Sequence, residues 1–292
     1  MTRRIGFVTS EDLPDCIADD RLAFDPLARH GFVTEPIVWD RATATDLERF
    51  DAVIFRSCWN YHHKPVAFAA WCQMLLGLSV QTFNDLAIIE WNFHKRYVLE
   101  LAQHDVLIPR SLLIDEHCPD VTMGLATWLA AGTSEQVVVK PAVSMSGYDT
   151  YCVARRDAAR IESLVREIRL ERDVIVQDFV AEVLDSGELS FVYFNGCFSH
   201  AVRKTPAKGE FRVQEEHGGR RDAYVPPAIE IATIDAIQAV IPGQTLYSRI
   251  DVVPHNGQFI VMELEVIDPM LYLASDSGAS DRFADAIASR LR

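Results

Sequence analysis

Three carboxylates near the C-terminus have the types and the spacing of a metal site. Glu263 and Glu265 are two residues apart in an apolar run, and Asp251 lies in the preceding run, before a turn at Asn256-Gly257. Alternate side chains of a strand share a face, so the glutamates point the same way and Asp251 can join them. Clustered carboxylates repel one another unless a cation lies between them, and Mg²⁺ prefers such oxygen ligands. A solvated outer face is the alternative, which the intervening apolar residues disfavour.

Two lysines and a small-residue loop form a second candidate site. Lys140 ends an apolar run, and the loop after it, residues 141–147, contains Ser146 and Gly147. Such a loop can cover phosphates with its backbone N–H groups. The sequence has no GxxxxGK[ST] or GxGxxG motif, so this is not a P-loop. Lys95, in a stretch predicted to be helical, is the second lysine; an ordinary surface position is the alternative for each.

A third group of cations lies in the segment 203–220. It contains Lys204 and Arg212 and ends near the pair Gly218-Gly219. A guanidinium fork can bind phosphate or carboxylate with two parallel hydrogen bonds, and the glycines give the backbone freedom. A charged surface loop is the alternative.

The elements that must position these residues fall into two patterns. The first 85 residues alternate strand-like and helical runs: strands at 4–9, 32–39 and 52–56, a helix at 21–30 closed by Gly31, and a helix at 68–76. This β-α-β alternation predicts a small parallel sheet with helices on its faces. Residues 57–61 follow a strand end, where open α/β sheets bind ligands; aromatic packing is the equal alternative.

The rest of the chain reads as antiparallel strands with helices. Predicted strands cover 109–114, 135–141, 148–153 and 174–179, and predicted hairpins cover 188–194 with 197–204 and 248–254 with 258–266, with a loop at 115–119. Predicted helices cover 84–101, 125–131, 158–169 and 281–291. Asn195-Gly196 and Asn256-Gly257 are the turns expected of two-residue hairpins.

Composition excludes several classes of protein. The net charge of −14 disfavours a protein that tracks nucleic-acid phosphates. No apolar run approaches the length that spans a bilayer, and polar residues interrupt the start before a signal peptide develops, so we expect a cytoplasmic protein. The six cysteines contain no CxxC pair and are expected to be free. Cys58 with His62 and His63 is interpreted as part of an aromatic cluster in preference to a metal site.

In this order, the three groups resemble the ATP-grasp ligases over roughly residues 85–275. Lys95 and Lys140 match the two nucleotide lysines of that family. The segment Val176–Glu182 is similar to its adenine-holding hinge strand. Gly209–Gln214 with Gly218-Gly219 is close to the GDFRxN…GG pattern of the branch that contains ribosomal-protein-S6 glutamate ligase, next to the glutathione-synthetase-like enzymes.

The resemblance implies a fold and a division of the chain. It implies an α/β (α+β) ATP-grasp fold, with an N-terminal parallel βαβ domain at 1–85 and two α+β subdomains, 86–185 and 186–292, that sandwich ATP. The nucleotide residues that it implies are Lys95, Lys140, Ser146, Gly147, Gln177, Phe179 and Glu182. It also implies two Mg²⁺ ions, replaceable by Mn²⁺, on Asp251, Glu263 and Glu265, and catalytic roles for Lys204, Arg212 and Arg249.

The implied function is an ATP-dependent ligase that converts a small amino-acid-like carboxylate into an acyl phosphate, which an amine then captures. Two residues depart from the family pattern: Glu265 replaces the usual Asn, and Ser190 stands where the S6-ligase branch has Arg. The segments YSRID and MELEVIDP are similar to a bacterial sub-branch that closes O-ureido-D-serine into the ring of D-cycloserine.

Two other functions are weighed against this one. A non-catalytic ATP-binding regulatory module would usually have lost a metal acid or a phosphate lysine, and a metal-dependent hydrolase would have no use for the phosphate flap. The expected partners are a small carboxylate and an amine, with no nucleic acid and no membrane. Assembly as a homodimer is left open.

Overall fold

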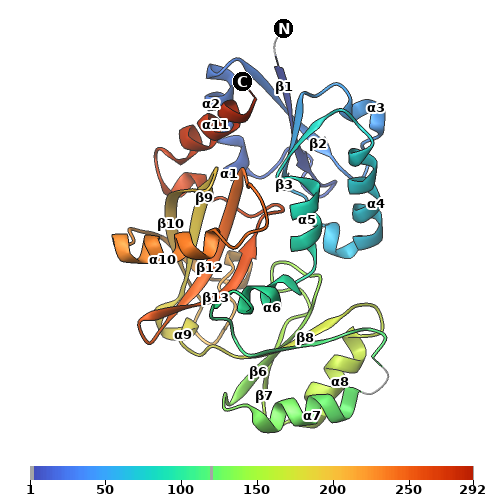
Figure 1. Ribbon diagram of the computed structural model, residues 1–292, viewed down its shortest axis with the longest axis vertical. Coiled ribbons are helices and arrows are strands. Elements are labelled where there is room, and N and C mark those ends of the chain that lie inside the picture. The colour runs from blue at the N-terminus through green and yellow to red at the C-terminus, as the bar shows by residue number, and fades with distance from the viewer. Residues whose placement is uncertain (1–2, 119–120, 292) are drawn as a thin grey trace.

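The computed structural model describes residues 3–118 and 121–291. Met1 and Thr2, at the start of the chain, and Pro119, in the predicted loop 115–119, lie outside these ranges. Three sheets follow one another along the long axis of the molecule (Figure 1). The α/β fold class predicted from the sequence is therefore confirmed.

The first sheet is parallel, as predicted. Its strands are β1 (Arg3–Thr9), β2 (Phe32–Val38), β3 (Ala52–Ser57) and β4 (Gln81–Phe83), in the order β2-β1-β3-β4. Helices α1 (Ala18–Arg21), α2 (Phe24–Arg29), α3 (Ala44–Leu47) and α4 (Pro65–Leu76) connect them. Every residue of β3 is buried, which fits a parallel strand covered on both faces.

The helix predicted at 21–30 is wrong in its extent. The segment forms two short helices, because Leu22 and Ala23 bond to carbonyls three residues back and tighten the chain between them. Gly31 follows α2 with φ +85°, the left-handed cap that was predicted. The short elements α3 and β4 were not predicted.

The central sheet is antiparallel. It contains β5 (Ser111–Ile114), β6 (Gln136–Pro141), β7 (Tyr151–Ala154) and β8 (Val174–Asp178), in the order β5-β8-β6-β7. The helices α7 (Val121–Ala131) and α8 (Ala158–Ile168) share a hydrophobic core with these strands. Strand β5 lies at an edge, as predicted.

The third sheet carries both predicted hairpins. Its order is β11 (Arg220–Tyr224), β10 (Cys197–Thr205), β9 (Glu188–Phe194), β12 (Tyr247–His255) and β13 (Gln258–Glu265). Both Asn-Gly turns have positive φ at each residue, as a two-residue hairpin turn requires. The helices α9 (Val183–Ser186) and α10 (Ala228–Gln238) and the 3₁₀ turns η1 (Tyr61–His63), η2 (Glu215–His217) and η3 (Leu273–Ser275) complete the connections.

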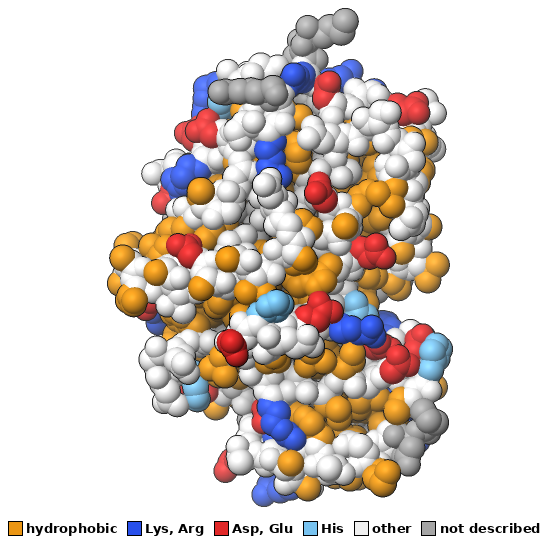
Figure 2. Space-filling view, in the orientation of Figure 1, with side chains coloured by type: hydrophobic (Ala, Val, Ile, Leu, Met, Phe, Trp, Pro, Cys, Tyr) orange, Lys and Arg blue, Asp and Glu red, His pale blue; other side chains and the backbone are white. Residues whose placement is uncertain are grey.

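Helix α10 and strand β11 were missed by the sequence interpretation. In α10 only Ile234 and Ile237 are buried, whereas Ile229 is exposed, so no clear apolar face marks the helix. Figure 2 shows hydrophobic side chains gathered over this part of the surface, where Val225 is also exposed.

The C-terminal helix α11 (Ala279–Arg290) returns to the first sheet. It contacts α2 (Figure 1), and Phe283 packs against Phe7 of β1, Phe194 of β9 and Tyr247 of β12. One core therefore joins the first and third sheets. The boundaries at residues 85 and 185 stay a prediction.

The placement of Lys95 on a helix was wrong. The predicted helix 84–101 is interrupted into α5 (Leu86–Phe93) and α6 (Tyr97–Ala102). His94 is extended, and the Lys95 N–H donates to the Ala142 carbonyl at 2.8 Å in place of a helix carbonyl. This bond fixes Lys95 beside the start of the predicted flap.

Candidate active site

Two neighbouring cavities share a wall near the ends of β6 and β13. The first contains Trp59, Lys204, Glu215, Glu216, Arg221, Arg249, Asp251, Glu265, Asp268, Met270 and Tyr272. The second contains Lys95, Val138, Lys140, Gly147, Gln177, Phe179, Glu188, Phe211, Arg212 and Met262, among others. Both are lined by Met145, Ser146, Val213, Gln214 and Glu263. The predicted metal acids and the predicted nucleotide residues thus belong to adjoining spaces.

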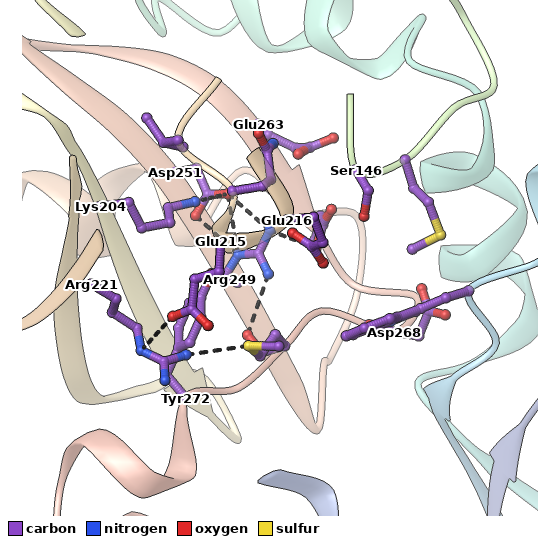
Figure 3. Close-up of a pocket in the computed structure, with 16 residues that line it drawn as sticks. Ser146, Lys204, Glu215, Glu216, Arg221, Arg249, Asp251, Glu263, Asp268 and Tyr272 are labelled. Carbon is purple, nitrogen blue, oxygen red and sulfur yellow. Dashed lines mark hydrogen bonds and ion pairs between the residues drawn. The ribbon is translucent and has the colours of Figure 1, made fainter. Parts of the chain in front are cut away.

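The wall of the first cavity is a lattice of buried charges on β10, β12 and β13 (Figure 3). Asp251 accepts from Nε of Arg249 at 3.0 Å and lies 3.2 Å from Nζ of Lys204. The other partner of Lys204 is Glu188, at 2.5 Å. Arg249 also pairs with Glu265 at 2.8 Å. The strand register explains this set, because Asp251 lies opposite Glu263 and Arg249 opposite Glu265.

Burial and charge act against each other on these acids. Burial disfavours the ionised form of Asp251, but Arg249 and Lys204 outweigh it and lower the pKa to about 2. For Glu263 the charge of Lys95 likewise outweighs burial, and the pKa lies below its usual value. Burial raises the pKa of Glu265 to about 8 although Arg249 is adjacent. The buried acids of this wall therefore outnumber the cations that can pair with them.

The donor set of the first cavity fits a divalent cation. Six acidic and three basic side chains line it, so its wall carries a surplus of negative charge. Within residues 3–118 and 121–291, however, no three His, Cys, Asp or Glu side chains are grouped as metal ligands. Asp251 and Glu265 instead form ion pairs with Arg249, and Glu263 forms one with Lys95. The predicted metal role of these three acids stays a prediction.

The second cavity fits an anion. Burial and the neighbouring Lys95 lower the pKa of Lys140 to about 8. Among the residues that the structure describes, none pairs with the Lys140 ammonium, whereas Lys95 has Glu263. A half-buried ammonium without a carboxylate partner is costly unless an anion binds it. Phosphate groups match this requirement.

The predicted flap lies over the same space. Ser146 and Gly147 have φ +49° and +69°, so the loop turns sharply at these residues. A Cβ added to Gly147 would lie 2.9 Å from Cδ of Arg212. Arg212 in turn is held by Glu210 at 2.8 Å, and this bond lowers the pKa of Glu210 to about 2. Arg212 therefore lies against the flap and lines the second cavity.

The other end of the second cavity is apolar. Val138, Phe179, Phe211 and Met262 line it, and the rings of Phe179 and Phe211 meet edge to face at 6.1 Å. This slot has the character that a planar base would need. Gln177 also lines it and donates to the Ser111 hydroxyl at 2.9 Å.

One predicted nucleotide residue is not brought to this cavity. Glu182 lies 2.5 Å from Nδ1 of His255 and is absent from the cavity wall among the described residues. Its predicted ribose contact stays a prediction. Arg212 lines only the second cavity, whereas the other predicted catalytic residues, Lys204 and Arg249, line the first.

Several residues of the site were missed by the sequence interpretation. Glu188, Arg221 and Tyr272 line the cavities, but none was assigned a role. Trp59, from the segment 57–61 where a ligand contact was predicted, also lines the first cavity. Glu188 faces Lys204 across paired strands β9 and β10, which the alternation of the hairpin could have indicated. Arg221 lies on the unpredicted strand β11, with its guanidinium carbon 4.9 Å from the centre of the Tyr272 ring.

The fold and the site define the class of protein. A family model described as the ATP-grasp domain of prokaryotic glutathione synthetase matches residues 126–269. The D-alanine–D-alanine ligase of Bacillus anthracis, crystallised with ATP, has the same fold, with a TM-score of 0.67 at 14% identity over 99% of this chain and 97% of that one. The chain belongs to the ATP-grasp ligases and is an ATP-dependent ligase.

Within this class the chain is similar to a particular enzyme. A model described as the N-terminal domain of D-cycloserine synthetase DcsG matches residues 5–84. The cycloserine biosynthesis protein DcsG of Streptomyces lavendulae is 27% identical over 277 residues, 90% of each chain. The crystal structure of D-cycloserine synthetase DcsG has a TM-score of 0.88 at 25% identity, over 99% of this chain and 100% of that one.

In the described part of the chain, no helix is both long and apolar enough to cross a bilayer.

Proposed function

We propose that this protein activates the carboxylate of a small amino acid with ATP and closes the acyl phosphate onto a nitrogen of the same molecule. The observation that carries the proposal is the wall shared by the two cavities. Glu263 and the flap residue Ser146 line both, so a molecule in the first cavity meets a nucleotide in the second at this point. Two separate spaces with one junction suit the transfer of a phosphoryl group.

The charges around the junction assign roles to the residues. Lys140 and Lys95 bind the phosphates, because Lys140 has no carboxylate partner among the described residues and Lys95 lies next to it. Arg212 steadies the transferred group from the flap side. Phosphoryl transfer depends mainly on positioning and on neutralising charge, and these three cations supply both.

The first step joins an oxygen of the substrate carboxylate to the γ-phosphorus, and the bond between that phosphorus and the bridging oxygen of ADP breaks. In the second step the nitrogen attacks the acyl carbon, inorganic phosphate leaves, and the nitrogen loses its proton. Arg249 and Lys204, which line the first cavity, stabilise the negative oxygen that forms on the acyl carbon.

Asp251, Glu263 and Glu265 would hold magnesium, two ions in all, with manganese as a substitute. The ions supply charge neutralisation for the nucleotide phosphates. The surplus of acids in the first cavity supports this assignment. When a cation binds, Lys95 and Arg249 no longer have to pair with these carboxylates and become available to the phosphates.

The similarity to D-cycloserine synthetase supports a specific substrate. We infer that O-ureido-D-serine is the amino acid and that its oxygen-bound nitrogen closes the ring. That nitrogen still carries the carbamoyl group, which water removes as carbamic acid to give D-cycloserine. The match extends over the first sheet as well as the ATP-grasp part, so it includes the region that carries Trp59 of the first cavity.

A phosphate-release assay tests the proposal. The protein is incubated with ATP, Mg²⁺ and a panel of small amino acids that contains O-ureido-D-serine, D-serine and D-alanine. We expect release with O-ureido-D-serine alone and a ring product by mass spectrometry. Release with pairs of amino acids would indicate an intermolecular ligase. ATP binding without release for any member would favour the non-catalytic module.

A further inference from the structure

One buried acidic residue of the first cavity belongs to none of the charge pairs described above. Asp268 follows β13 and is 4% exposed. Its Oδ2 atom is buried and has no hydrogen-bond partner in the described part of the chain. Asp251, Glu263 and Glu265 each have a cation within reach, so Asp268 differs from every predicted metal ligand. A buried carboxylate oxygen without a partner is costly and calls for an explanation.

The backbone around Asp268 is held from both sides. The Tyr247 hydroxyl lies 2.8 Å from the Ile267 carbonyl, and the Trp59 indole N–H donates to the Asp268 carbonyl at 3.2 Å. Arg56 donates to the Pro269 carbonyl at 2.6 Å, and Arg249 to the Met270 carbonyl at 3.3 Å. Four consecutive carbonyls are thus fixed by four different side chains. The Asp268 carboxylate itself accepts from the Cys58 backbone N–H, which leaves only Oδ2 without a partner in the described part of the chain.

The nearest strong cation is already occupied. Arg56 is fully buried and donates twice to Asp20, at 3.0 and 2.9 Å, and Ser57 donates to the other oxygen of Asp20 at 2.6 Å. Burial raises the pKa of Asp268 to about 7 even though Arg56 acts in the opposite direction. The site therefore lacks one positive charge next to Asp268.

Figure 3 shows Asp268 on the side of the cavity away from Lys204 and Arg221. The wall that carries Asp268 also carries Trp59, whose indole is hydrogen-bonded to the Asp268 backbone. An aromatic face beside a carboxylate is a favourable environment for an ammonium group.

We propose that Asp268 binds the α-ammonium group of the amino-acid substrate. This inference rests on the proposed function and adds the residue that distinguishes an amino acid from a simple carboxylic acid. The substrate carboxylate lies at the junction near Glu263, and the ammonium donates to Oδ2 of Asp268. Binding satisfies the orphaned oxygen and supplies the missing charge, so both charged groups on the α-carbon are fixed.

The test compares O-ureido-D-serine with its deaminated counterpart, 3-(ureidooxy)propanoate, on the wild type and on Asp268→Asn. The asparagine keeps the shape of the side chain and removes its charge. ADP formation is measured at saturating ATP. For the wild type we expect KM for the deaminated compound to be about 10- to 100-fold higher, as for loss of a hydrogen bond to a charged group. Asp268→Asn should raise KM for the amino acid by a similar factor and should no longer distinguish the two.

The controls separate this inference from the proposed function. Asp281→Asn removes an acidic charge from the surface helix α11 and should leave KM for both compounds unchanged. KM for ATP should be the same in all variants. If the wild type turns over both compounds equally well, the ammonium role is wrong, and this result needs no variant. If Asp268→Asn discriminates like the wild type, Asp268 only fastens the backbone. If the wild type releases no ADP with the amino acid, the proposed function itself fails.

Discussion

The two cavities share Glu263 but differ in the balance of acidic and basic side chains on their walls. In the first, Arg249 and Lys204 are each bound to two carboxylates, and acids outnumber bases. In the second, Lys140 has no carboxylate partner among the described residues, and an apolar slot lies beside it. The first cavity therefore has too few cations for its carboxylates, and the second has an ammonium group that an anion could pair with.

This difference shows how the free protein can keep a dense set of charges buried. In the free protein, Glu263 forms an ion pair with Lys95, and Glu265 forms one with Arg249. Breaking a buried pair by removing one member is strongly destabilising, because the other charge is left uncompensated. Ligands that bring their own charges can replace these partners, which couples the filling of one cavity to that of the other.

Glu263→Gln should have the largest effect, because Glu263 belongs to both cavities. The substitution removes a charge that pairs with Lys95 and that would hold the metal. We expect turnover to fall by about 10²- to 10³-fold, as when a group that stabilises transition-state charge is lost. Phosphate release measures this, with the exposed Glu167→Gln on α8 as a control. A variant with normal turnover would show that the junction does not contain the reacting groups.

Lys140→Ala should act on the nucleotide alone. We expect ATP affinity to weaken by about 1.5–3 kcal/mol, the range for hydrogen bonds to charged groups. Titration calorimetry measures the affinity, and Lys208→Ala, an exposed lysine, serves as the matched control. Equal affinity in the two variants would remove Lys140 from the ATP site.

The same lysine predicts a proton linked to ATP binding. Burial and Lys95 lower its pKa to about 8, so near pH 8 part of the free protein has a neutral Lys140. Bound phosphate favours the ammonium, and ATP binding should take up protons near pH 8 but not well below it. In the free protein the folded state binds fewer protons than the unfolded chain between the folded pKa and 10.5, so stability should rise with pH there. Calorimetry in buffers of different ionisation enthalpy detects the uptake, which Lys140→Ala should abolish.

Gly147→Ala should weaken ATP binding by a smaller amount. The residue has φ +69°, and an added Cβ would meet Arg212. A left-handed conformation costs an L-residue roughly 1–2 kcal/mol, which we expect as lost ATP affinity. Gly196→Ala carries the same kind of strain at φ +74° in a turn with free space, and should lower thermal stability without changing ATP affinity. Identical behaviour of the two variants would mean that the flap does not close over ATP.

Glu265→Asn should have the smallest effect. The variant restores the residue usual in the family and keeps one oxygen donor, so we expect activity at a severalfold higher magnesium concentration. If Glu265 only pairs with Arg249, the melting temperature should fall while the magnesium dependence stays the same. Activity as a function of magnesium and melting curves with and without it separate these outcomes.

The sequence by itself determined the parts of the site that depend on local geometry. Strand alternation places Glu263 and Glu265 on one face, and the Asn256-Gly257 turn pairs β12 with β13. A bulge between Asp251 and Val252, which the turn does not dictate, then brings Asp251 opposite Glu263. Lys140 and the flap after it follow from a strand that ends at a proline. These features are readable because strand alternation and turn chemistry act over a few residues.

Contacts between distant segments decided the rest. The break at His94 that turns Lys95 toward Glu263 depends on the carbonyl of Ala142, and α11 closes the core of a sheet that lies at the other end of the chain. Trp59 and Arg56, over 200 residues earlier, hold the carbonyls of Asp268 and Pro269, and Oδ2 of Asp268 has no hydrogen-bond partner among the residues that the structure describes. Such positions are set by packing and by the competition of buried polar groups for partners, which no local pattern of residues records.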